Sequence, residues 1–308
     1  MTLDLTTSLQ IKNYGTWRVV EIIQRVIFTV LLFSFVSVSL FHMRKMKKVK
    51  KLVIFLISIC LYISFKIDES LLSLILLSNY NDGKKPEPHL FISIYILDTI
   101  GLRFFFYCIS TLTTRLLKRQ DHSQLVTKVN RLNVNTVRAF YYDETMRSET
   151  KVNSTPKEDS KNKQLSVILF WIIASISIIA TFLNIIGSCV ALNNQVTSTC
   201  LLQVSSVLFL IDIIVVILIL FYIMINFISK GSSESRTSTI LLMITSFSIL
   251  IKCSNFVISS WGGLDLENLN KYMFLYGDYV YYTYSALMPE IFGTILILVE
   301  YSRWYNCC

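Results

Sequence analysis

Seven apolar stretches follow one another along the chain, and polar segments separate them. The stretches cover residues 18–42, 52–78, 89–114, 165–192, 199–228, 238–260 and 279–301. A helix needs about 20 apolar residues to cross a hydrocarbon core of roughly 30 Å, and every stretch is at least that long. The pattern predicts an all-α, polytopic membrane protein in the form of a seven-transmembrane helix bundle.

The second stretch is the least regular of the seven. Its centre reads FKIDES, so Lys66, Asp68 and Glu69 stand close together within an otherwise apolar run. Two interpretations are open. Either the stretch is one long span, or the span ends near Phe65 and residues 70–79 lie at the membrane interface.

Charge is distributed unevenly over the segments between the stretches. The net charge is +9, and most of the basic residues lie in the sequence RKMKKVK after the first stretch and in residues 115–164. The loops on the opposite side hold only Lys84, Lys85 and Lys271. Because loops rich in Lys and Arg stay in the cytoplasm, we expect the N-terminus outside and the C-terminus in the cytoplasm. Nothing in the pattern is typical of nucleic-acid binding.

These assignments divide the chain into an outer N-terminal segment (1–17), three helices (18–114), a basic and partly disordered cytoplasmic loop (115–164), four helices (165–301) and a cytoplasmic tail (302–308). The second half of the loop, RSETKVNSTPKEDSKNK, is polar and is expected to be disordered. Its first half places Leu125, Val129 and Leu132 at near-helical spacing among basic residues. That half is either an amphipathic helix on the membrane surface or a cytoplasmic continuation of the third helix.

Aromatic residues gather at the ends of the stretches, where rings prefer the headgroup level. They are Trp17, Trp261, Tyr276, Tyr279, Tyr281 and Tyr282 at outer ends, and Trp304 and Tyr305 at an inner end. We expect these rings to lie at the membrane interfaces.

Six ionisable residues fall well inside the stretches: Lys66, Asp98, Arg103, Asp212, Lys252 and Glu290. A charge at the centre of a bilayer costs about 2.5 to 3.5 kcal/mol on insertion scales, so such residues face the bundle interior and pair. Asp98 and Arg103 are five residues apart, which is poor spacing for a pair on one helix. We expect Lys252 to pair with Asp212 or Glu290.

Two interpretations of these six charges are open. They form a ligand or ion site, or a switch, or else they only fix the packing of the helices. The charges at the outer ends, Glu21, Arg25 and Asp278, are expected to be solvated.

Cysteine and proline add three local expectations. Cys189 and Cys200 flank one short loop and are candidates for a disulfide, and Cys307 and Cys308 are candidates for lipidation. Pro289 is expected to kink the last helix.

The chain lacks the residues that several kinds of activity require. The histidines, His42, His89 and His122, stand at span ends or in a loop, so no metal site in the bundle core is predicted. The last stretch has no lysine for a retinal Schiff base. We predict a protein that is not an enzyme and has no cofactor.

The last two stretches read TSTILLMITSFSILIKCSNFVISSW and YVYYTYSALMPEIFGTILILVEY, joined through LDLENLN. This part resembles the seven-helix domain of the plant tobamovirus multiplication proteins and of their animal relatives, the orphan receptor-like proteins of lysosomes. The residues that match are Lys66, Lys252, Cys253, Tyr281, Tyr282 and Pro289. Ala286 stands where the family has an acidic residue, and Glu290 follows the proline instead.

The resemblance implies a non-enzymatic protein of endolysosomal or vacuolar membranes, whose cytoplasmic face binds partners such as small GTPases. The leading functional hypothesis is a receptor-like scaffold that recruits a soluble partner to such a membrane. One alternative is a divergent receptor coupled to a heterotrimeric G protein, with a ligand near Lys66, Asp98 and Lys252. Another alternative is a transporter of protons or small solutes that uses Asp98, Asp212 and Glu290.

Overall fold

The protein is a bundle of long helices. The computed structural model describes the backbone of residues 13–43, 50–81, 88–142, 157–191, 193–230, 233–262 and 276–306. The helices are α1 (Tyr14–Met43), α2 (Lys50–Asn81), α3 (Pro88–Tyr142), α4 (Lys157–Val190), α5 (Gln195–Lys230), α6 (Ser233–Trp261), and a last helix made of α7 (Tyr279–Tyr282), the π-turn η1 (Thr283–Leu287) and α8 (Met288–Asn306). The described ranges contain no strand, which confirms the all-α fold.

Six of these helices are long and apolar enough to cross a membrane. The remaining one, α2, is 32 residues long but carries Lys66, Asp68 and Glu69 near its middle. It is one continuous helix, so the chain does not leave the helix near Phe65. Seven helices in all therefore form the bundle, and they agree with the seven apolar stretches.

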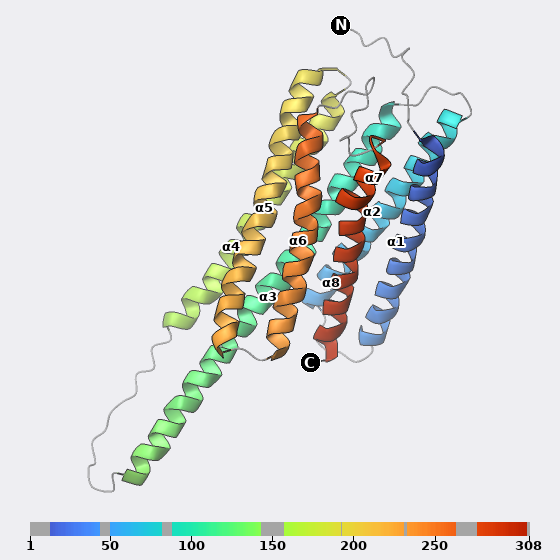
Figure 1. The fold of residues 1–308 in the computed structure, drawn as a ribbon. Coiled ribbons are helices and arrows are strands. Elements are labelled where there is room, and N and C mark those ends of the chain that lie inside the picture. Colours follow the sequence, from blue (N-terminus) through green and yellow to red (C-terminus); the bar gives the residue numbers. More distant parts are fainter. Residues whose placement is uncertain are drawn as a thin grey trace.

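The helices pack mostly against their neighbours in sequence, and the last helix closes the bundle by packing against α6 and α1. The exception is α3, which contacts α2, α4, α5 and α6. In Figure 1, α3 runs obliquely through the bundle and continues beyond the other helices. It is the central helix of the fold.

The continuation of α3 decides between the two interpretations of residues 115–142. The apolar span on this helix ends at Leu117, and the helix goes on to Tyr142. The first half of the long connection is thus a continuation of the third helix. In its second half, α4 already begins at Lys157, so residues 157–163 are helical and the prediction of disorder is wrong for them. Residues 143–156 lie outside the described part of the chain.

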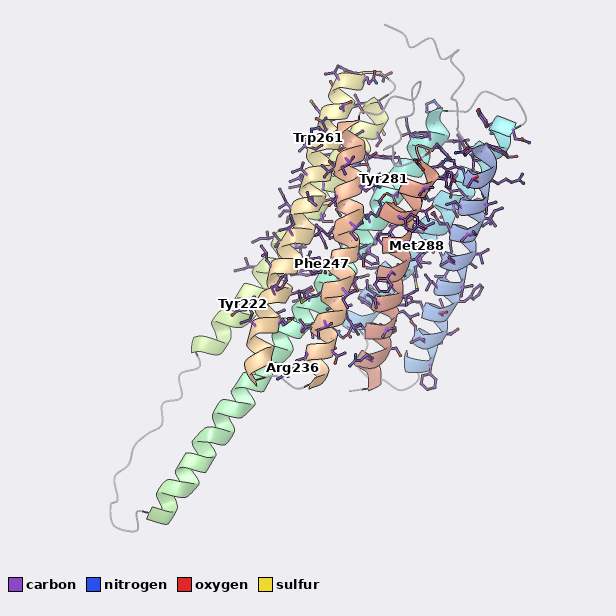
Figure 2. All side chains as sticks on the ribbon, viewed as in Figure 1. Tyr222, Arg236, Phe247, Trp261, Tyr281 and Met288 are labelled. Carbon is purple, nitrogen blue, oxygen red and sulfur yellow. The ribbon has the colours of Figure 1, made fainter. Side chains whose placement is uncertain are left out.

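The surface of the bundle is apolar and its interior holds the polar groups. Figure 2 shows Tyr222, Phe247 and Met288 on the outside of α5, α6 and α8, where each side chain is exposed. By contrast, the charged side chains of Lys66 and Lys252 are fully buried. Apolar side chains on the surface and charged side chains in the interior are typical of a protein whose surroundings are lipid.

Aromatic rings cover the bundle around the N-terminal end of α1. The ring of Trp17 lies 5.4 Å from that of Tyr276 and 5.2 Å from that of Tyr282, measured between centroids. All three side chains are buried, whereas Trp261 is exposed. Trp17, Tyr276 and Tyr282 thus pack together inside the bundle and do not face outward, and the depth at which these rings lie in a membrane stays a prediction.

The last helix adapts to Pro289 without breaking. A proline inside a regular helix clashes with the carbonyl four residues before it, here that of Ser285. The helix widens into the π-turn η1, in which Met288 N–H donates to the carbonyl of Thr283, five residues back. The predicted irregularity is present, but it lies in the residues that precede Pro289.

Candidate functional site

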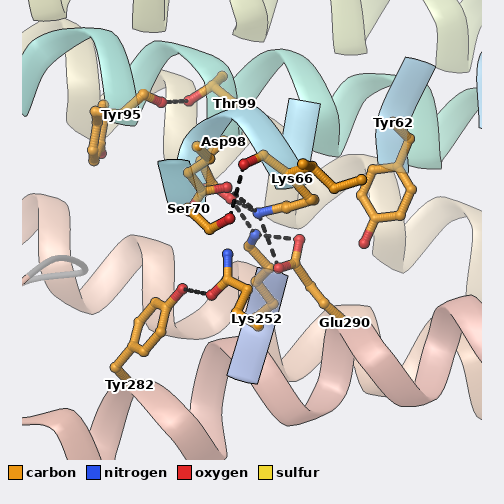
Figure 3. A network of polar contacts seen from close by, with 12 residues as sticks. Tyr62, Lys66, Ser70, Tyr95, Asp98, Thr99, Lys252, Tyr282 and Glu290 are labelled. Carbon is orange, nitrogen blue, oxygen red and sulfur yellow. Dashed lines mark hydrogen bonds and ion pairs between the residues drawn. The ribbon is translucent and has the colours of Figure 1, made fainter. Parts of the chain in front are cut away.

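Four charged side chains from four different helices meet in the interior of the bundle. They are Lys66 of α2, Asp98 of α3, Lys252 of α6 and Glu290 of α8, and each is at most 1% exposed. Figure 3 shows these side chains converging on one another. Two consecutive pairs of helices, α2 with α3 and α6 with the last helix, thus share one polar centre.

Each lysine contacts the same two carboxylates. Lys252 Nζ lies 2.7 Å from Asp98 Oδ1 and 2.5 Å from Glu290 Oε1. Lys66 Nζ lies 3.0 Å from Glu290 Oε2 and also pairs with Asp98 Oδ1. Lysine and carboxylate therefore alternate around the centre, so that like charges are separated by opposite ones.

A fifth residue, Glu69, belongs to the same network. Its Oε2 lies 2.8 Å from Lys66 Nζ, one turn further along α2. Sequence reasoning treated Glu69 only as part of an irregular span. The signal that identifies it is its spacing from Lys66, because residues three apart on a helix are neighbours. We call Lys66, Glu69, Asp98, Lys252 and Glu290 the ion-pair network.

The π-turn sets the direction in which Glu290 points. Tyr282 and Glu290 are eight residues apart and both are 1% exposed. At about 100° per residue, eight residues of regular α-helix place two side chains about 80° apart around the axis. A π-turn inserts one extra residue, so the pair behaves as if seven residues apart and lies within about 20°. The turn thus aligns both side chains with the interior.

Neutral polar groups surround the ion-pair network. The phenol of Tyr282 donates to Gln24 Oε1 at 2.9 Å, which ties the last helix to α1. Thr294 Oγ1 lies 3.2 Å from the hydroxyl of Tyr62 and donates to the carbonyl of Glu290 at 2.6 Å. These bonds hold the side chains around Glu290 in place, so one of these side chains cannot move without breaking a bond to its neighbour.

The expected pairing of Lys252 with Asp212 or Glu290 is confirmed for Glu290. Asp212 is fully buried on α5, and neither of its carboxyl oxygens has a hydrogen-bond partner among the described residues. A bond of 2.7 Å between Ser206 and Ser260 sets the register of α5 against α6. Lys252 meanwhile points toward α3 and α8.

Arg103 also lies outside the ion-pair network. Its side chain is half-buried on α3, and it forms no ion pair within the part of the chain that the structure describes. Of the six ionisable residues that the sequence singles out, the structure therefore brings together four: Lys66, Asp98, Lys252 and Glu290.

Glu21 corrects an expectation about the rim of the bundle. The side chain is 1% exposed, so it is not solvated. The reason is the aromatic cluster of Trp17, Tyr276 and Tyr282, which covers the N-terminal end of α1. Arg25 and Asp278 are exposed, as expected. Asp278 caps the last helix, since its Oδ1 accepts from Val280 N–H at 2.8 Å.

The cysteines form no bridge in the described residues. Cys189 and Cys200 are both free and exposed, so the predicted disulfide is wrong. Gly187 faces α5, because a Cβ there would lie 3.1 Å from the Cβ of Leu201. Two residues turn a helix by about 200°, so Cys189 points away from that interface. Cys307 and Cys308 lie outside the described residues.

The centre of the network is occupied by two ammonium groups. Within the described ranges, no group of three or more His, Cys, Asp or Glu side chains is suited to a metal ion. The arrangement joins helices through charge, and any change in its charge state acts on four helices together.

Comparisons of the chain with models of protein families, with curated proteins and with solved structures find no match. The resemblance to the tobamovirus multiplication proteins therefore stays a prediction. A functional proposal has to start from the helix bundle, its buried charges and its long central helix.

Proposed function

We propose that this chain is a receptor-like membrane scaffold without enzymatic activity, which recruits a soluble partner through the extension of α3. The observation that carries the proposal is the length of this helix. It continues for 25 residues past Leu117, where its apolar span ends, to Tyr142. At about 1.5 Å per residue the extension reaches about 37 Å from the bundle, and Figure 1 shows it clear of the other helices.

The extension is basic. Between residues 118 and 142 the sequence has Lys118, Arg119, Lys128, Arg131 and Arg138, against Asp121 alone. A surface of one sign attracts partners of the opposite sign and speeds their association. The expected partner is therefore a soluble protein with an acidic face, and a small GTPase is the class that the resemblance suggests.

The same end of the bundle collects further positive charge. In Figure 1, α1 ends and α2 begins at the end from which α3 projects. The basic sequence RKMKKVK joins these two helices. The positive-inside rule supports a cytoplasmic location for this end, with the N-terminus outside and the C-terminus in the cytoplasm. The resemblance supports an endolysosomal or vacuolar membrane.

Partner capture from mild-detergent extracts tests the proposal. The test variant replaces the five basic residues of the extension by Gln (K118Q, R119Q, K128Q, R131Q, R138Q). The control replaces the three basic residues of the opposite loops (K84Q, K85Q, K271Q). We expect the intact protein and the control to retain a small GTPase and the test variant to lose it at least about tenfold. Equal recovery with all three proteins would reject the proposal.

A second candidate is a receptor that couples to a heterotrimeric G protein. The observation that favours it is the ion-pair network, because a ligand that changed its charges would act on α2, α3, α6 and α8 at once. A non-hydrolysable GTP analogue, added to half of each captured sample, separates the two candidates. Release of a heterotrimeric G protein by the analogue would favour the receptor. The transporter alternative required Asp98, Asp212 and Glu290 together, and no observation favours it.

A further inference from the structure

Glu21 is a buried carboxyl group that the ion-pair network does not include. Its side chain is 1% exposed, and neither carboxyl oxygen has a hydrogen-bond partner among the described residues. Exposed Asp278, on the same side of the bundle, caps a helix and faces water. At this end of the bundle, Glu21 therefore needs an account of how its charge is tolerated.

The groups around Glu21 offer it no free positive charge. From α2, Glu69 and Lys66 act on it, and the like charge of Glu69 acts more strongly than the opposite charge of Lys66. The ammonium group of Lys66 is already paired with three carboxylates, those of Glu69, Asp98 and Glu290. The other lysine of the network, Lys252, is likewise paired, with Asp98 and Glu290.

The neutral groups near Glu21 also bond to other side chains. The hydroxyl of Ser73 lies beside Glu21 and shares a hydrogen bond of 2.6 Å with the phenol of Tyr276, in which either hydroxyl can donate. From α7, the phenol of Tyr282 donates to Gln24, the residue one turn along α1. An ionised carboxylate here would have no counter-charge of its own, which is a costly state for a buried carboxyl group.

Charge balance leads to the same conclusion. Glu21 and the ion-pair network together hold four carboxyl groups but only two lysines, Lys66 and Lys252. Full ionisation would leave two uncompensated negative charges in the low-dielectric interior of the bundle, where such charges are strongly disfavoured. Positive charge has to be bound in addition to the two lysines.

We propose that Glu21 is a proton-binding site, in which the carboxyl group holds a proton at neutral pH. Loss of this proton would create a buried negative charge close to that of Glu69. A proton suits the site better than a metal ion does. A cation needs several free oxygen ligands, but the oxygens of Ser73, Tyr276 and Gln24 are committed to other bonds. A proton needs one oxygen, and Glu21 has two that are free.

Infrared spectroscopy of the intact protein in lipid nanodiscs tests the proposal. A protonated carboxyl group has a C=O band that a carboxylate lacks and that shifts in heavy water. We expect the wild type at neutral pH to have such a band and Glu21→Gln to lose it. The matched control, Asp278→Asn, should keep the band, because Asp278 is exposed. An unchanged spectrum in Glu21→Gln would overturn the proposal.

Two further measurements keep the test decisive. Labelling all glutamates with carbon-13 shifts the band of a protonated glutamic acid in the wild type, so the absence of a shifted band overturns the proposal even if the variant does not fold. Thermal unfolding in sodium, potassium, calcium or choline chloride tests for a metal ion. If one of these cations stabilised the wild type but not Glu21→Gln, the site would bind that cation, and the proposal of a bound proton would be overturned.

Discussion

At the scale of single residues, ion pairs between two lysines and three carboxylates hold the interior of the protein together. Lys252 holds Asp98 and Glu290, and Lys66 holds the same pair and Glu69. The network proper carries one more negative than positive charge. Removal of a lysine therefore leaves two surplus negative charges, while removal of one lysine and one carboxylate restores the original balance.

This arithmetic predicts the stability of two variants. Lys252→Met should lower the free energy of unfolding by about 3 to 5 kcal/mol, since it leaves Asp98 and Glu290 to share Lys66 and adds an uncompensated buried negative charge. The double variant Lys252→Met/Glu290→Gln should be more stable than Lys252→Met alone. Unfolding by denaturant of the reconstituted protein measures both variants and the single variant Glu290→Gln. A double variant whose loss equals the sum of the two single losses would show that Lys252 and Glu290 do not interact.

Sequence reasoning identified the buried charges but not all of their partners. A charged residue inside an apolar stretch is visible in the sequence, which is why Lys66, Asp98, Lys252 and Glu290 were found. Whether such a residue pairs depends on the direction of its side chain, and that direction is set by packing. Asp212 looks the same as Asp98 in the sequence, yet only Asp98 faces a lysine. Glu21 lies near a span end, and the aromatic rings that bury it come from distant segments.

At the scale of helices, the π-turn η1 determines which residues of the last helix face the interior. Sequence reasoning predicted a disturbance from Pro289, but not its form, because a kink and a π-turn both relieve the clash of a proline ring. The turn that forms is the one that directs both Tyr282 and Glu290 inward. The extension of α3 was easier to foresee, because apolar residues recur at helical spacing after residue 115. The sequence left open only whether that helix lies on the membrane surface or continues the third helix.

Removal of one residue from the π-turn tests its role. Tyr284 is 72% exposed, so its deletion costs little packing. Deletion should restore a regular helix in which Tyr282 and Glu290, now seven residues apart, still lie within about 20° of each other. We therefore expect the deletion to keep the ion pairs of Glu290 and to change the unfolding free energy little. Tyr284→Ala, which keeps the residue count and the π-turn, is the control and should change stability equally little. A deletion that costs about 3 kcal/mol or more, as for a broken buried ion pair, would contradict the role of the turn.

At the scale of the whole molecule, the fold is a lipid-facing bundle with one helix that leaves it. The seven apolar stretches predict the bundle, since a span requires length and apolarity and both are visible in the sequence. The path of α3 through the middle of the bundle could not be predicted, because it depends on its contacts with α2, α4, α5 and α6.

The continuity of α3 can be measured as a distance. Spin labels at Thr111 and Val129 lie on either side of Leu117, 18 residues and five helical turns apart. If the helix continues through Leu117, the two backbone positions are about 27 Å apart, and pulsed electron resonance in nanodiscs should find a single narrow distribution near that length. A shorter or broad distribution would mean that the helix bends where it leaves the bundle.

Such continuity makes α3 a lever. Asp98 is held by both lysines near the middle of the bundle, and Tyr142, the last residue of the helix, is 44 positions further along the chain. The arm between them is about 66 Å long if the helix is straight. A tilt of about 5° about Asp98 would then move the tip by about 6 Å, more than the length of one helical turn. If a change in the protonation or pairing of the buried charges tilted α3, the far end of the helix would move. The displacement would be large enough to make or break a contact with another protein.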